Sequence, residues 1–141
     1  MSNIIAALGL SQLNKLDRMV EMRRKNAHLM SQKLSRVKGV KTPVEPEGLY
    51  HVYQMYTIMV PESMRNGLKQ HLEEAGIMSK VFFSPVHKTY FYKNELKYRC
   101  ALPVTEAVSA RVLTLPICPS LSAGEINTIT DRIAGFFSKA A

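Results

Sequence analysis

Hydrophobic residues recur at helical spacing through the first 42 positions of the chain, and no proline interrupts them. This pattern predicts one long helix or two helices in series. Residues 14–17 contain Asn and Asp, which favour helix caps over helix interiors, so we expect any break to fall there. The first helical region carries an apolar stripe that we expect another part of the assembled protein to cover. The stripe comprises Ile4, Ile5, Leu8 and Leu16.

Three later stretches carry the β-branched and aromatic side chains that are typical of strands. Residues 50–60 contain no Asp, Glu, Lys or Arg, which predicts a central strand. A second strand is expected near residues 78–83. The segment VLTLPI, residues 112–117, predicts a third, short strand that Pro116 closes.

Helix signals lie between and after these stretches. A helix is predicted to start at Ser63 and to end at Gly76, because glycine commonly terminates helices. Another helix is expected to open at Pro103, since proline is well suited to the first helical position. Ser122 and Glu125 have the spacing of a capping box, which predicts the start of the last helix.

The order helix, strand, helix, strand, loop, helix, strand, helix predicts an α+β fold. We expect a small mixed or antiparallel sheet covered by helices, with a long N-terminal helix, in a single domain over residues 1–141. No run approaches the ~20 apolar residues that a membrane helix needs, so no membrane partner is expected. Cys100 and Cys118 are the two cysteines, and they lack metal-type spacing. We expect both to be buried and the protein to be cytoplasmic.

Positive charge is concentrated in two regions of a chain whose formal net charge is +8. Residues 15–41 contain nine Lys and Arg against two acids, and residues 80–99 contain five against one. A basic surface of this kind binds nucleic acid, an anionic metabolite or an acidic protein, or is a solvated helix face. The basic residues of the first region spread around a helix instead of lining one face, which disfavours nucleic acid.

The residues do not form a complete catalytic set. The sequence has no phosphate-binding loop, dinucleotide fingerprint or zinc pattern, and no Ser-His or Cys-His pair with a supporting motif. We therefore predict neither a metal site nor a catalytic residue. His28 and His71 lie on charged helices and are expected to be solvated. For His51 and His87, structural and functional roles both remain open.

The segment KVFFSPVHKTYFY, residues 80–92, holds five of the eleven Phe and Tyr side chains of the chain. This density fits a buried strand, a stacking platform for nucleic acid or the wall of a ligand pocket. Pro85 ends the preceding strand, and residues 84–99 show neither strand alternation nor a helical stripe. We therefore expect residues 84–99 to form a long loop that faces a substrate.

Four segments, taken in order, carry a resemblance to a known family. They are MSNIIAALGLSQLNKLD, HVYQMYTI, LKQHLEEAGIMSKVFFSPVHKTYFY and LPVTEAVSARVLTLPICPSLSAGEINTI. With this order and spacing the chain resembles the C-terminal part of the DegT/DnrJ/StrS family, the PLP-dependent sugar aminotransferases. The resemblance implies the small C-terminal domain of an aspartate-aminotransferase-like enzyme of fold type I. The large domain, which carries the PLP-binding lysine, would be absent from this chain.

The resemblance further implies that the parent enzyme uses PLP to transfer an amino group, usually from glutamate, to a nucleotide-linked keto-sugar, and acts as a homodimer. This chain alone would be inactive and hold no cofactor, because the aldimine lysine lies outside it. A basic nucleic-acid-binding module, using residues 15–41 and the rings at 82–92, is the rival hypothesis. Small domains of the family close over the active site, which implies substrate binding by His51, Tyr53, Phe83, His87, Lys88 and Tyr90.

Overall fold

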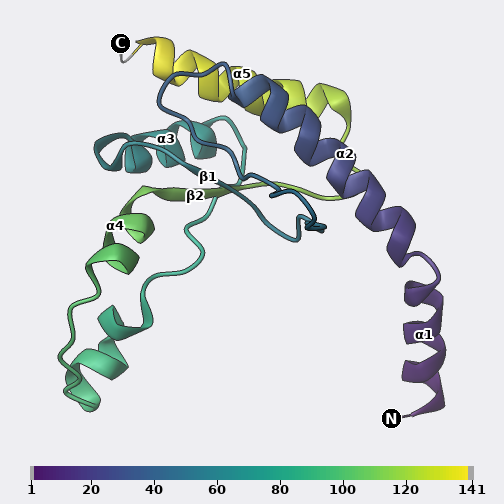
Figure 1. Ribbon diagram of the computed structural model, residues 1–141, viewed down its shortest axis with the longest axis horizontal. Coiled ribbons are helices and arrows are strands. Elements are labelled where there is room, and N and C mark those ends of the chain that lie inside the picture. Colours follow the sequence, from purple (N-terminus) through teal and green to yellow (C-terminus); the bar gives the residue numbers. More distant parts are fainter. Residues whose placement is uncertain (1, 140–141) are drawn as a thin grey trace.

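The computed structural model describes residues 2–139 as a layer of helices on a small sheet, from which two projections extend (Figure 1). One projection is α1, and the other is the chain between the sheet and α4. Within residues 2–139, no helix combines the length and the apolar character needed to cross a membrane. The helices and strands are α1 (Asn3–Leu13), α2 (Leu16–Leu34), β1 (Tyr56–Met59), α3 (Glu62–Glu74), α4 (Pro103–Arg111), β2 (Val112–Leu115) and α5 (Ala123–Lys139).

Two helices in series at the N-terminus confirm the predicted break. α1 begins after Ser2, whose Oγ accepts a hydrogen bond from the backbone N–H of Ile5 at 3.4 Å. Asn14 and Lys15 separate α1 from α2. The chain changes direction at this point, so that α1 extends away from the helical layer (Figure 1).

α1 has no buried residue in the structure. The four residues predicted to form an apolar stripe are all exposed, and Ile4 retains 82% of its accessible surface. Leu10 and Leu13 are exposed as well. Because successive residues are rotated by about 100° along a helix, Leu10 lies on the opposite side of α1 from Leu8. α1 is therefore apolar on all sides. The exposed apolar surface of α1 is larger than the single stripe that the sequence predicted.

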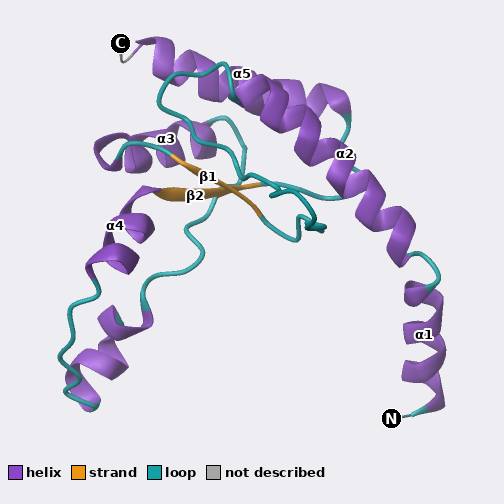
Figure 2. Ribbon diagram, viewed as in Figure 1, coloured by secondary structure: helices purple, strands orange, loops and turns teal. Residues whose placement is uncertain are grey.

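β1 and β2 form an antiparallel two-stranded sheet, which confirms the antiparallel alternative (Figure 2). Tyr56 lies opposite Leu115, and Ile58 lies opposite Leu113. Side chains alternate between the two faces of a sheet, so these four point to the same face. All four are almost completely inaccessible to solvent. This face of the sheet therefore packs against the hydrophobic core.

The strand predicted over residues 50–60 is confirmed only for β1. Tyr53 has a φ of 46°, which lies in the left-handed region that strands do not use. The N–H of Tyr53 donates to Nδ1 of His51 at 2.9 Å, and the N–H of His51 donates to the carboxylate of Glu45 at 3.1 Å. Side chains thus satisfy the backbone donors of His51 and Tyr53, which take no part in a sheet.

The strand predicted near residues 78–83 is reduced to a single bridge. Lys80 exchanges two backbone hydrogen bonds with Thr114 of β2, at 3.0 and 2.8 Å. β2 begins at Val112, directly after α4, so a longer strand would soon have no residues to pair with. The chain accordingly leaves the sheet, and Phe82 and Phe83 are exposed.

α2, α3 and α5 lie on one side of the sheet and supply most of the core (Figure 2). α5 packs against both α2 and α3. The apolar residues of these helices recur at helical spacing, which places them on the faces that meet. The fully or nearly buried ones are Ala27, Met30, Leu34, Leu68, Leu72, Ile126, Ile129, Ile133 and Phe137.

The predicted signals at two helix ends are confirmed. Gly76 follows α3 with a φ of 74°, and the N–H of Ile77 reaches back to the carbonyl of Leu72 at 2.8 Å, as in a Schellman motif. At the start of α5, the N–H of Glu125 donates to Oγ of Ser122 at 3.2 Å. The Glu125 carboxylate in turn accepts from the N–H of Ser122 at 2.8 Å, which completes the capping box.

The loop between β2 and α5 is held by a side chain of α2. Nδ2 of Asn26 donates to the carbonyl of Cys118 at 3.0 Å and to that of Leu121 at 3.1 Å. Cys118 thus contributes a backbone carbonyl to the packing while its side chain is exposed, and Cys100 is half-buried. The prediction that both cysteines are buried was therefore wrong.

Candidate functional site

A projecting arm, residues 81–102, carries four of the six predicted binding residues. It leaves the sheet after Lys80 and returns to it through α4 (Figure 1). The prediction of a loop over residues 84–99 is corrected by two single-turn helices, η1 (Val86–Lys88) of the 3-10 type and η2 (Phe91–Glu95) of the π type. Neither turn has a buried residue, so contacts outside them must hold the arm in place.

Glu106, near the start of α4, makes such contacts. Its Oε1 lies 3.0 Å from Nε2 of His87 and accepts a hydrogen bond from the backbone N–H of Leu102 at 3.3 Å. Its Oε2 pairs with Nζ of Lys88. The side chain of His87 is only 9% exposed, whereas that of Lys88 is half exposed. One carboxylate therefore holds two consecutive side chains of η1.

These contacts lower the pKa of Glu106 from 4.5 to about 2. The hydrogen bond from Lys88 is the largest cause, followed by those from His87 and from the Leu102 N–H. Because the pKa is lower in the folded than in the unfolded chain, the contacts stabilise the fold fully above about pH 4.5. That stabilisation is lost as the pH falls toward 2, so Glu106 is a carboxylate at neutral pH.

Only strongly acidic conditions are expected to release η1 from α4. In the 141-residue chain, the Glu106 carboxyl carbon followed by NMR should titrate with a midpoint of about 2. Lys88→Met should raise this midpoint, because it removes the largest cause of the shift. Lys97→Met, an equivalent change at an exposed lysine of the same arm, should leave it in place. A midpoint of 4.5 in the unsubstituted chain would show that the contacts do not form in solution.

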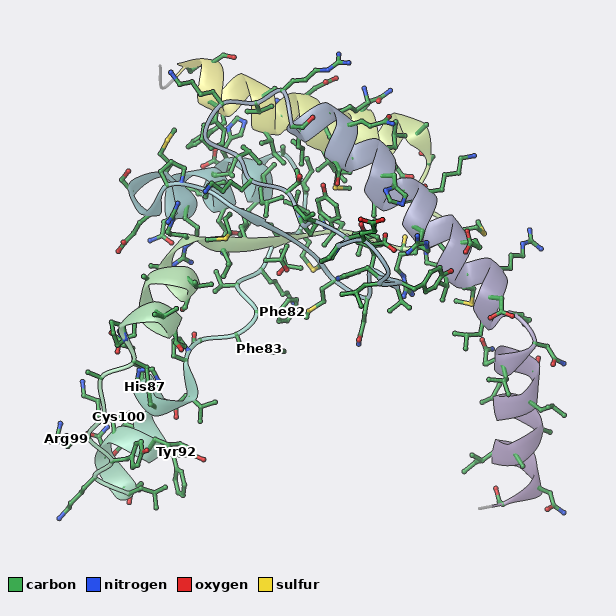
Figure 3. The ribbon with its side chains drawn as sticks, in the orientation of Figure 1. Phe82, Phe83, His87, Tyr92, Arg99 and Cys100 are labelled. Atoms are coloured by element: carbon green, nitrogen blue, oxygen red, sulfur yellow. The ribbon has the colours of Figure 1, made fainter. Side chains whose placement is uncertain are left out.

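The arm and α4 surround a cavity of about 420 Å³ that has a surplus of positive charge, here called the basic cavity. Figure 3 shows His87 and Arg99 on the same part of the arm. Glu106 is the only carboxylate in the lining, and it already pairs with Lys88. Within residues 2–139, Lys93 and Arg99 make no ion pair, so they are the cavity's available cations. The lining comprises His87, Lys88, Lys93, Tyr98, Arg99, Cys100 and Glu106.

A second cavity, of about 380 Å³, lies where the arm leaves the core and is here called the apolar hollow. Phe82 and Phe83 contribute aromatic rings whose centroids are 4.9 Å apart, and Phe83 is 73% exposed (Figure 3). α4 borders both cavities, because Glu106 lines the basic one and Val104 lines the apolar one. The lining of the hollow comprises Phe82, Phe83, Val104, Thr105, Val108, Ser109 and Val112.

His51 and Tyr53 form a separate cluster beside α2. Nη1 of Arg24 donates to the carboxylate of Glu45 at 2.8 Å and to the carbonyl of His51 at 2.7 Å. The hydrogen bond from Arg24 lowers the pKa of Glu45. The ring of His51 lies 4.2 Å from that of Tyr53, which is only 2% exposed, and burial raises the pKa of Tyr53. The cluster fastens the chain before β1 to α2.

The structure thus brings some of the predicted binding residues together and separates others. His87 and Lys88 share a carboxylate in the basic cavity, and Phe83 lines the adjacent apolar hollow. Tyr90, between η1 and η2, is 72% exposed and lines neither cavity. His51 and Tyr53 line neither cavity, and their predicted binding roles would require a ligand or protein segment that reaches both regions.

Five residues that line the basic cavity were not among the predicted ones: Lys93, Tyr98, Arg99, Cys100 and Glu106. A signal for Glu106 was present in the sequence. Residues 80–111 contain six Lys and Arg but only two acids, Glu95 and Glu106. A carboxylate in such a basic region is expected to find a cationic partner, but the identity of that partner depends on how the arm folds back onto α4.

The remaining histidines and the acids do not assemble into a metal site within the described part of the chain. No group of three or more His, Cys, Asp or Glu side chains comes together in residues 2–139. His28 is exposed, as predicted. His71 is half-buried, with its ring 5.5 Å from that of Phe136, so the prediction that it is merely solvated was incomplete.

Comparison with known proteins gives a consistent match over most of the chain. The sequence profile of the DegT/DnrJ/EryC1/StrS aminotransferase family matches residues 1–134. The dTDP-4-dehydro-2,3,6-trideoxy-D-glucose 4-aminotransferase of Saccharopolyspora spinosa is 33% identical over 132 residues, which cover 93% of this chain and 33% of that protein. GDP-perosamine synthase of Vibrio cholerae is 28% identical over 141 residues, which cover 98% of this chain and 38% of that protein.

Solved structures show the same similarity. The aminotransferase TlmJ from Streptoalloteichus hindustanus superposes with a TM-score of 0.87 at 26% identity, covering 96% of this chain and 36% of that one. The chain therefore spans about a third of the length of the relatives that it matches. None of these relatives supports the nucleic-acid-binding alternative.

Proposed function

Because this chain belongs to the DegT/DnrJ/EryC1/StrS aminotransferase family, we propose that it is the small C-terminal domain of a larger enzyme that aminates a nucleotide-linked keto-sugar. The names of the two curated relatives include a dTDP-linked and a GDP-linked sugar, which supports this substrate class. The larger enzyme would have fold type I, use pyridoxal phosphate (PLP), take its amino group from a donor such as glutamate, and act as a cytoplasmic homodimer.

The observation that carries the proposal is the pair of cavities that α4 borders. A nucleotide-linked sugar combines an anionic diphosphate with apolar ring faces and several hydroxyl groups. Lys93 and Arg99 suit the diphosphate, since they are cations without a carboxylate partner in residues 2–139. Phe83 suits a ring face, and His87 a hydroxyl group.

The other predicted contacts belong to the same proposal. Lys88 lines the basic cavity, although its ammonium is already paired with Glu106. Tyr90 is exposed on the arm, where a second protein segment or the substrate can contact it. His51 and Tyr53 would take part only when the rest of the enzyme closes over both regions.

The residues of this chain do not fit the PLP site itself. PLP, when bound, supplies the electron sink for amino transfer, and the proteins that hold it use a Schiff-base lysine and a group facing the pyridine nitrogen, often an aspartate. Asp17 and Asp131 are the only aspartates of the chain, and both are exposed on helices. We therefore assign to this chain the binding and orientation of the sugar nucleotide and no catalytic residue.

A comparison of the longer protein with the 141-residue chain tests this assignment. The longer protein, supplied with PLP, glutamate and a dTDP- or GDP-linked keto-sugar, is expected to form the amino sugar and 2-oxoglutarate. The 141-residue chain is expected to form neither. After incubation with PLP and reduction with borohydride, its intact mass should show no stoichiometric adduct at a single lysine.

Two results would contradict the assignment. Turnover by the 141-residue chain, accompanied by a stoichiometric lysine adduct, would show that it contains the catalytic site. A longer protein that binds PLP but aminates no sugar nucleotide would refute the proposed substrate class. Salt-dependent binding of the chain to a random oligonucleotide would instead support the nucleic-acid alternative.

A further inference from the structure

The contact between His87 and Glu106 helps to hold the arm and also bears on which nitrogen of the His87 ring carries a hydrogen. Nε2 of His87 and Oε1 of Glu106 are 3.0 Å apart, and this is the only hydrogen bond that the imidazole ring makes within residues 2–139. The same carboxylate accepts a hydrogen bond from the N–H of Leu102 and pairs with Lys88, so two contacts besides that with His87 position it. The ring of His87 is thus attached at one nitrogen to a carboxylate that two further groups also hold.

The protonation state of Glu106 decides which ring nitrogen carries the hydrogen. Its pKa of about 2 makes it a carboxylate at neutral pH, and a carboxylate can only accept hydrogen bonds. Nε2 of His87 must therefore be the donor. In a neutral imidazole the other nitrogen, Nδ1, then has a free lone pair and acts as an acceptor.

Nδ1 of His87 has no hydrogen-bond partner in the described part of the protein, residues 2–139. Two side-chain polar atoms of these residues are fully buried without a partner, Nε of Arg23 and Oγ of Ser79, and Nδ1 of His87 is not among them. Its residue lines the basic cavity. An unpartnered acceptor on a residue that lines a cavity is suited to a group that donates a hydrogen bond.

We propose that Glu106 is a positioning residue that holds His87 in the Nε2–H tautomer, so that Nδ1 accepts a hydrogen bond from a hydroxyl group of the substrate. The proposal rests on the proposed function, because it requires that the basic cavity receive the sugar nucleotide. It adds a restriction on the substrate: the group that meets His87 is a donor such as a hydroxyl, and not a carbonyl oxygen or a phosphate.

The tautomer can be measured without any ligand. In the 141-residue chain labelled with ¹⁵N-histidine, long-range ¹H–¹⁵N correlation at a pH where the ring is neutral is expected to show the hydrogen of His87 on Nε2. A resolved downfield Nε2–H proton should accompany it. Glu106→Met should broaden this proton through exchange with water and allow both tautomers. Glu95→Gln, which removes a carboxylate from the same arm, should leave the spectrum of His87 unchanged.

Two outcomes of this experiment overturn the proposal. One is a hydrogen on Nδ1 in the unsubstituted chain, a result that does not depend on any variant folding. The other is a Glu106→Met spectrum in which the His87 tautomer and its Nε2–H proton are unaltered, while circular dichroism shows the chain to be folded.

Kinetics of the longer enzyme separate the positioning role from the proposed function. Glu106→Met is expected to lower kcat/KM for the sugar nucleotide by about tenfold, the usual effect of losing one hydrogen bond to a charged group. In a His87→Ala background the same change should cost less than about twofold, because Glu106 acts through His87. Equal losses in both backgrounds would overturn the positioning role. If His87→Ala leaves the kinetics of the longer enzyme unchanged, while the unsubstituted chain shows the Nε2–H tautomer, the proposed function would be refuted and the positioning role would not.

Discussion

Replacing both Ile5 and Leu8 of α1 with glutamate is expected to abolish self-association of the 141-residue chain. α1 has no buried residue, and its apolar side chains lie on all sides. Helices of that kind are normally buried, because water contact with so much apolar surface is unfavourable. A second copy of the chain is a partner that is always present, so we expect it to cover part of α1 in solution.

The expected effect is large because both side chains would be buried in the contact. Burial of one Ile or Leu side chain contributes roughly 1.5–3 kcal/mol, before the cost of ordering the contact. Losing two such contributions weakens a dissociation constant by a factor on the order of 10² to 10⁴. The introduced carboxylates would add the cost of burying charge.

Light scattering coupled to size exclusion, over a range of concentrations, measures this effect. The unsubstituted chain should show a mass above that of a monomer, and the double variant should be monomeric. Ser63→Glu with Asn66→Glu, which adds the same charge at exposed positions of α3, should leave the mass of the unsubstituted chain in place. A strictly monomeric unsubstituted chain at high concentration would contradict the prediction.

Replacing His87 with alanine in the longer enzyme is expected to raise KM for the sugar nucleotide about tenfold or more. The substitution removes the Nδ1 acceptor from the basic cavity and leaves the Glu106 carboxylate with Lys88 and Leu102 alone. The absorption spectrum of bound PLP should not change, because we assign no part of the PLP site to this chain. The fold should also persist, since η1 lies on the projecting arm and contributes no residue to the hydrophobic core.

Steady-state kinetics with varied sugar nucleotide, together with a thermal melt, distinguish binding from packing. Glu95→Ala on the same arm is the control, because Glu95 is exposed and lines neither cavity. A His87→Ala enzyme with unaltered kinetics and a melting temperature lowered by several degrees would show that His87 is a packing residue. The basic cavity would then lose its proposed role in substrate binding.

Most of the helices could be predicted from the sequence because their signals are local. The capping box of Ser122 and Glu125 and the turn at Gly76 depend on residues within one helical turn of each other. The break between α1 and α2 falls at Asn14, where a side chain that favours caps meets the end of a helical pattern. Such interactions form in much the same way wherever the helix later packs.

The strands were predicted less well, because strand formation depends on a partner. Residues 50–55 have strand-like side chains, but His51 and Glu45 accept the hydrogen bonds that a sheet partner would have received. Lys80 pairs with Thr114 for a single bridge, because β2 is short and follows α4 directly. Neither restriction is visible in the strand-like segments themselves.

In the candidate site, too, the local features could be predicted from the sequence, whereas the contacts between distant residues could not. The sequence by itself indicated a ring-rich, basic segment with His87 and Lys88 side by side, and it indicated an apolar first helix that needs a partner. Only the tertiary structure brought Glu106 to these two side chains and separated His51 from them. The physical reason is that hydrogen bonds and ion pairs act over a few ångströms, so their partners are decided by how the arm folds back onto α4 and not by distance along the chain.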